Sequence, residues 1–142
     1  MLFRSAALAI ELQRLREPLD LATLYLGGGT PSHLGPAGLR RLFGILHERL
    51  RPAADAEVTV EANPLDVTAD FVAACRDVGA TRVSLGGQSL GAATLKSLDR
   101  DHAPDDVRAA VARLLDAGLV VSLDIMTAAP GQTLAEIGRA HV

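Results

Sequence analysis

The sequence has few of the residues that mark secreted, membrane or nucleic-acid-binding proteins. It holds one cysteine in 142 residues, which excludes an internal disulfide framework and favours a reducing compartment. Its net charge of −3 gives no electrostatic reason to bind nucleic acid. No apolar run approaches the roughly 20 residues of a membrane-spanning helix, and Arg4, Glu11 and Arg14 interrupt the apolar N-terminal patch that a secretory signal would need. We therefore expect a cytoplasmic protein without a membrane span.

Hydrophobic residues, by contrast, are plentiful and evenly distributed. They make up 49% of the chain, so a folded core is expected rather than disorder. We find no internal repeat, low-complexity stretch or linker, and the length suits one domain, residues 1–142.

Helical and strand patterns alternate along this domain. Apolar residues at helical spacing predict helices over about residues 5–17, 35–50, 69–78, 92–98 and 104–117, and another that begins near 134. Runs rich in β-branched and leucine residues predict strands over 24–26, 58–60, 81–85 and 120–126. This order with short connections implies an α/β fold, a parallel sheet with flanking helices, either doubly wound or part of a βα barrel.

Several residues are expected to set the boundaries of these elements. Ser5 and Thr68 can cap helices, Gly79 and Gly118 can end them in a left-handed conformation, and Pro52 closes the helix that begins near residue 35. Thr133 and Glu136 have capping-box spacing. Cys75 falls at a core position of its helix, so we interpret it as a small buried hydrophobe rather than a nucleophile or metal ligand.

The stretch LYLGGGTP, residues 24–31, organises the chain. Leu24, Tyr25 and Leu26 suit a buried parallel strand, and the three glycines after it allow a sharp turn and a close approach of the backbone to a ligand. The stretch reads either as a backbone cradle for a small polar ligand or as an ordinary tight turn between strand and helix.

Polar groups also follow the other predicted strands. Glu61 and Gln88 lie at or just past the ends of their strands, and Asp124 lies towards the end of the last one. In parallel α/β folds this edge is where ligands bind. With Arg100 as a fork for a carboxylate and the bare backbone at Gly28 and Gly29, these groups suit an amino-acid head group joined to a ribose. The alternative is a set of unrelated loop residues, and Arg100 could equally be a solvated charge at a helix end.

The chain contains no catalytic set that could act alone. No Ser-His-Asp order is visible, and no cluster of cysteine, histidine and carboxylate has metal-binding spacing. Residues 27–30 lack the lysine of a phosphate-binding P-loop and are too short for a dinucleotide fingerprint. We predict neither catalytic residues nor metal ligands within the chain.

Five motifs, in this order and spacing, resemble a known family. They are residues 27–31 (GGGTP), 61–64 (EANP), 82–89 (RVSLGGQS), 98–102 with Leu98, Arg100 and His102, and Asp124 ahead of 130–133 (PGQT). The chain resembles the radical S-adenosylmethionine (SAM) proteins of the oxygen-independent coproporphyrinogen III oxidase type, and the EANP spelling looks like their heme chaperone branch. The resemblance covers most of the chain, from about residue 24 to residue 133.

The resemblance implies a partial βα barrel that binds SAM on a [4Fe-4S] cluster. It also implies that the following residues contact SAM, with Arg100 on the methionyl carboxylate: Gly28, Gly29, Thr30, Glu61, Gln88, Arg100 and Asp124. Heme or a porphyrinogen, client proteins that receive heme, and an electron donor are the implied partners.

Three departures from the family pattern stand out. Gly87 replaces the usual valine, Leu90 a common phenylalanine, and residues 127–129 (TAA) the usual aromatic-Gly-Leu. The last change removes an aromatic wall from the rim of the pocket and puts the substrate preference in doubt.

The family's three cluster cysteines precede the glycine loop, and this chain has none there. We expect a truncated core domain that lacks the cluster-binding strand and the C-terminal strands and is inactive alone. Codons available for residues 1–5 include a DNA sequence whose reverse complement lies within one spelling of residues 136–142. This inverted repeat resembles read-through of a sequencing adapter, so we expect natural sequence from about Ala6 to about Ala135.

Three functions remain open on the sequence alone. The parent protein is a heme chaperone, the reading that the EANP spelling favours, or a radical oxidase that decarboxylates porphyrinogen propionates. The third possibility is a generic parallel α/β domain without a cofactor.

Overall fold

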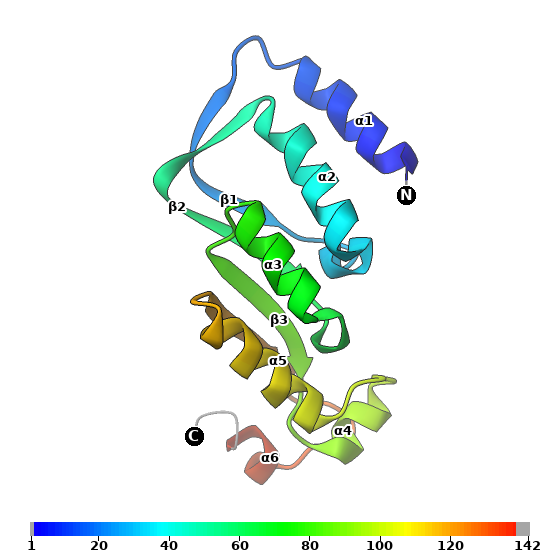
Figure 1. Ribbon diagram of the computed structural model, residues 1–142. Helices are drawn as coiled ribbons and strands as arrows, with labels where there is room; N and C mark the ends of the chain where they lie inside the picture. The colour runs from blue at the N-terminus through cyan, green and yellow to red at the C-terminus, as the bar shows by residue number, and fades with distance from the viewer. Residues whose placement is uncertain (1, 139–142) are drawn as a thin grey trace.

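The computed structural model describes residues 2–138, in which helices and strands alternate in the predicted order (Figure 1). The elements are α1 (Leu2–Gln13), β1 (Leu19–Leu26), η1 (Pro31–Leu34), α2 (Gly35–His47), β2 (Leu50–Ala62), η2 (Pro64–Asp66), α3 (Ala69–Asp77), β3 (Arg82–Gln88), α4 (Ala92–Ser97), α5 (Pro104–Asp116), β4 (Val120–Ile125) and α6 (Leu134–Gly138). Of the ends expected to derive from an adapter, Met1 and residues 139–142 lie outside the described residues, and that origin stays a prediction.

The four strands form one parallel sheet in the order β1-β2-β3-β4. Helices α2, α3 and α5 lie side by side on one face of this sheet (Figure 1). A doubly wound sheet reverses its strand order and carries helices on both faces, whereas strands in chain order with an outer layer of helices are the arrangement of a βα barrel. The predicted α/β class is confirmed, and of its two variants the structure has the partial barrel.

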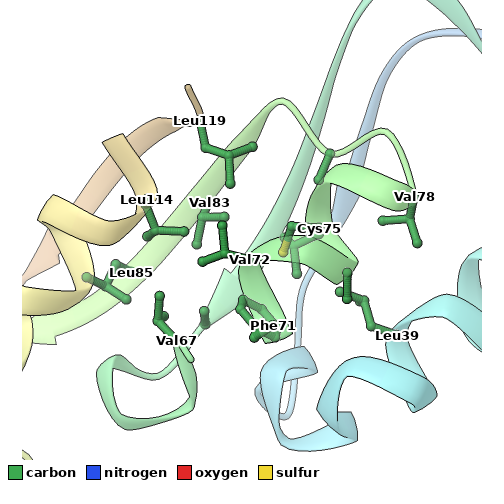
Figure 2. Close-up of a cluster of buried hydrophobic side chains, with 14 of the residues drawn as sticks. Leu39, Val67, Phe71, Val72, Cys75, Val78, Val83, Leu85, Leu114 and Leu119 are labelled. Carbon is green, nitrogen blue, oxygen red and sulfur yellow. The ribbon is translucent and has the colours of Figure 1, made fainter. Parts of the chain in front are cut away.

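Alternating side chains of the strands face the helical layer and form the core. Val58, Val60, Val83 and Leu85 are all at most 4% exposed, and they pack with side chains of α2, α3 and α5. Figure 2 shows Val83 and Leu85 in this cluster. Phe71 of α3 lies among them. Fully burying a side chain of this size stabilises the fold by about 1.5–3 kcal/mol, so this cluster holds the sheet in place.

The opposite face of the sheet, which we call the inner face, carries polar side chains. Arg82 Nη1 lies 3.0 Å from Glu57 Oε1, and Thr59 Oγ1 donates to the same oxygen over 3.3 Å. Thr59 and Ser84 are nevertheless 1% and 5% exposed. The sheet therefore separates an apolar helical side from a polar side.

The start of β2 corrects a predicted boundary. Helix α2 ends at His47, and Leu50 and Pro52, expected to end that helix, belong to β2 and pair with β1. Proline cannot donate to a ladder and is tolerated where a strand has a neighbour on one side only. β3 pairs with β2 from Thr59 onwards, so Pro52 occupies such a place.

Most of the predicted caps are confirmed. Thr68 Oγ1 accepts a hydrogen bond from the Phe71 N–H over 3.2 Å at the start of α3, and Gly79 and Gly118 both have a φ of 77°. Glu136 Oε2 accepts from the Thr133 N–H over 2.8 Å, as the capping box requires. The expectation for Ser5 is wrong, because α1 begins at Leu2.

The helices are short. α2 and α5, at 13 residues each, are as long as any helix among residues 2–138. None of the helices in this part of the chain is long and apolar enough to cross a membrane.

Candidate functional site

The glycine loop, residues 27–30, leaves the C-terminal end of β1 in an unusual conformation. Gly28, Gly29 and Thr30 have φ values of 80°, 67° and 56°, all in the left-handed region. Glycine adopts this region freely, whereas a β-branched residue such as Thr30 is strained there by about 1–3 kcal/mol. Pro31 then begins the 3-10 turn η1, and the chain enters α2.

Glu61, near the end of β2, is bound to this loop. Its Oε2 accepts a hydrogen bond from the Gly28 N–H over 2.9 Å, and its Oε1 accepts one from Tyr25 Oη over 2.8 Å. The first donor comes from the loop and the second from β1. The carboxylate is thereby fixed above the point where β1 ends.

One side chain from each strand continues this arrangement across the inner face. Glu61 is the register partner of Ser84 on β3, and Ser84 Oγ donates to Asp124 Oδ2 on β4 over 2.9 Å. We call Tyr25, Glu61, Ser84 and Asp124 the polar row. Hydrogen bonding to Glu61 is the main cause that raises the pKa of Tyr25 above its ordinary value of 10.0.

Gln88 and Arg100 complete the predicted set but lie outside the row. Gln88 ends β3 with a φ of 60°, and its carbonyl accepts from the Met126 N–H over 2.8 Å. Arg100 is exposed beyond α4 and lines a hollow of about 240 Å³ together with Lys96 and His102. No residue of the polar row lines that hollow among the described residues. The structure thus brings Gly28, Glu61, Gln88 and Asp124 to the C-terminal edge of the parallel sheet, whereas Arg100 lines a separate hollow.

A second link ties the segment after the glycine loop to the segment after β2. Ser32 is 2% exposed, and its hydroxyl donates to Asp66 Oδ2 over 2.6 Å and accepts from the Asn63 N–H over 2.9 Å. His33 Nε2 lies 3.3 Å from the same Asp66 oxygen. These contacts hold the segment that follows the glycine loop, whereas Glu61 holds the loop itself.

Sequence reasoning missed two members of the polar row. Tyr25 was expected in a buried strand, yet it is 59% exposed, so that expectation is wrong. The available signal was alternation, because Leu24 and Leu26 flank Tyr25 as Val83 and Leu85 flank Ser84. With a strand period of two, the residue between two core positions points to the other face.

The polar row and the glycine loop offer acceptors and backbone donors to a small molecule. Two carboxylates accept hydrogen bonds from hydroxyl or ammonium groups, which fits the ribose and amino group of SAM. The row does not fit a metal, because no group of three or more metal-ligating side chains occurs within residues 2–138. Cys75 is fully buried and desolvation raises the pKa of its thiol to about 12, so it does not fit an iron-sulfur cluster (Figure 2).

The sequence model of the radical SAM superfamily matches residues 3–141, almost the whole chain. The chain belongs to the radical SAM superfamily. Membership implies SAM and a [4Fe-4S] cluster as cofactors of the superfamily's proteins.

Radical SAM relatives with curated names include heme chaperones. The chain is 40% identical to the heme chaperone HemW of Mycobacterium tuberculosis over 131 residues. This alignment covers 89% of this chain and 34% of the relative. It is 37% identical over 117 residues to HemW of Bacillus subtilis, covering 81% and 31%. An oxygen-independent coproporphyrinogen III oxidase of Bradyrhizobium diazoefficiens is 29% identical over 129 residues, covering 90% and 29%. The chain thus spans about a third of the length of these relatives.

A solved radical SAM structure has the same fold. The coproporphyrinogen III oxidase HemN from Escherichia coli superposes with a TM-score of 0.85 at 27% identity, over 94% of this chain and 32% of that one. The predicted family and the predicted partial barrel are both confirmed.

Proposed function

We propose that the chain is part of the core domain of a radical SAM heme chaperone, in which it supplies the SAM-binding edge of the barrel. The observation that carries the proposal is the identity of 37–40% to heme chaperones against 29% to an oxidase. Heme is then the cargo, and client proteins and an electron donor are further partners. A cytoplasmic location belongs to the same proposal.

In this proposal each residue at the strand ends binds or orients SAM. Glu61 and Asp124 accept hydrogen bonds from the ribose hydroxyls and the amino group, and the backbone at Gly28 and Gly29 lets the ligand approach closely. Thr30 and Gln88 line the same edge. Arg100, which is exposed at the neighbouring hollow, binds the methionyl carboxylate.

Binding of SAM to the chain tests this assignment. We expect calorimetric titration to give saturable binding that weakens in Glu61→Gln and Asp124→Asn. Glu57→Gln is the matched control, because Glu57 lies on the inner face of the same strand and pairs with Arg82 instead. Equal binding by all four proteins, or no binding by wild type, would contradict the site.

The cluster has no ligands in this chain, so its thiolates come from residues outside these 142 in the proposed parent. We expect anaerobic reconstitution of the chain with iron and sulfide to leave no stoichiometric cluster, measured by visible absorption and iron content. Cys75→Ala should behave identically. A stoichiometric, oxygen-sensitive cluster that Cys75→Ala abolishes would contradict the prediction.

A second candidate is a radical oxidase acting on a porphyrinogen. The fit to HemN, with a TM-score of 0.85, supports it. The two candidates differ in outcome for a longer protein that contains this chain: a chaperone transfers heme to an apo-protein without decarboxylating coproporphyrinogen III, and an oxidase does the reverse. Thr127→Tyr, which restores an aromatic residue at the rim, tests whether residues 127–129 set the preference.

A further inference from the structure

Tyr25 and Glu61 lie over a bare stretch of backbone. A Cβ at Gly27 would lie 2.6 Å from Tyr25 Cε1 and 2.8 Å from Glu61 Oε1, closer than real Cβ contacts. The φ of Gly27 is not among the left-handed values, so this glycine is required for space rather than for backbone conformation. The absence of a side chain at Gly27 therefore leaves room for the ring of Tyr25 and the carboxylate of Glu61.

The hydrogen bonds of Glu61 leave room for a ligand. Each carboxylate oxygen can accept about two hydrogen bonds, and here Oε1 accepts one from Tyr25 and Oε2 one from Gly28. One acceptor position remains on each oxygen. The Glu61 carboxylate is therefore held in one orientation and can still accept hydrogen bonds from a ligand.

We propose that Tyr25 is a positioning residue of the SAM site: its hydroxyl, together with the Gly28 N–H, holds the Glu61 carboxylate so that its remaining acceptor positions face the ligand's hydroxyl or ammonium groups. This inference rests on the proposed function, which names SAM as the ligand. Without the phenol hydroxyl, Glu61 keeps one donor and regains rotamer freedom, which binding must then remove at a cost in affinity.

The first test concerns the hydrogen bond itself and needs no ligand. The sequence has one tyrosine and no tryptophan, so near-ultraviolet absorbance follows Tyr25 alone during a pH titration. The side chains of Glu61, Ser84 and Asp124 face its hydroxyl, and the carboxylates raise its pKa. We expect an apparent pKa above 10.0 in wild type and in Glu57→Gln, and a lower value in Glu61→Gln. The same value in wild type and Glu61→Gln overturns the proposal.

The second test measures SAM binding in Tyr25→Phe, which removes only the hydroxyl. We expect the dissociation constant to rise about three- to tenfold, the range of one net hydrogen bond, with the thermal midpoint unchanged. Tyr25→Phe combined with Glu61→Gln should bind no more weakly than Glu61→Gln alone, since Tyr25 acts through Glu61. Equal binding by wild type and Tyr25→Phe overturns the positioning role alone. No binding by wild type overturns the proposed SAM site and the positioning role with it.

Discussion

Gly87 occupies a place in the core where the structure leaves no space for a side chain. A Cβ there would lie 2.5 Å from Leu123 Cδ1 and 3.3 Å from Val107 Cγ1. The residue is buried, and its carbonyl lies 3.1 Å from Nε2 of the buried His102. Leu123 and Val107 therefore fill the space that a side chain at Gly87 would need.

This close packing predicts that Gly87→Ala destabilises the protein. Overpacking a core costs about 1–3 kcal/mol, and we expect a loss in that range from denaturant unfolding. In a Leu123→Ala background the same substitution should cost less than in wild type, because the two sites share one volume.

The control is Gly44→Ala, in open space on the exposed side of α2. It should stabilise the protein by up to about 1 kcal/mol through helix propensity. A neutral Gly87→Ala would show that Leu123 moves aside at no cost.

At the scale of elements, the side chain of Thr68 caps the N-terminus of α3. Thr68 Oγ1 accepts the Phe71 N–H, and Phe71 is one of the largest buried side chains. Thr68→Ala removes the acceptor, and the expected loss is about 1 kcal/mol of unfolding free energy. Thr68→Ser keeps the oxygen and should retain most of the stability by thermal denaturation. If serine and alanine destabilise equally, packing of the methyl group rather than capping explains the effect.

The kinds and order of the elements were predictable because apolar periodicity differs between helix and strand. The beginnings of β1 and β2 were not, since Leu19 and Leu50 pair with each other where the sheet has two strands and little burial. Alternation is weak there, and Pro52 suggested a helix end instead.

The candidate site was likewise predictable in part. Glu61 and Asp124 follow from the rule that parallel strands end at one edge. Tyr25 required the face of each strand residue to be known, and the place of Arg100 depends on how the chain leaves α4.

For the whole molecule, β1 and β4 are the outer strands of the sheet, and neither pairs with a further strand among the described residues. Open edges invite pairing between copies, so we expect concentration-dependent association in sedimentation velocity runs. Leu19→Lys, on the exposed edge strand β1, should reduce it, because a charge there opposes pairing. Leu65→Lys changes a similarly exposed leucine in η2 and should have no effect. A monomer at all concentrations would contradict the expectation.

The consecutive strand order also sets how the backbone exchanges protons with solvent. Thr59 and Val60 have neighbours on both sides, and their side chains are 1% and 0% exposed. Protection against deuterium uptake follows the free energy needed to open each segment. Deuterium should therefore enter β1 and β4 first and the doubly paired parts of β2 and β3 last, so that isotope labelling would spread from the sheet's margins toward the two strands that bear Glu61 and Ser84.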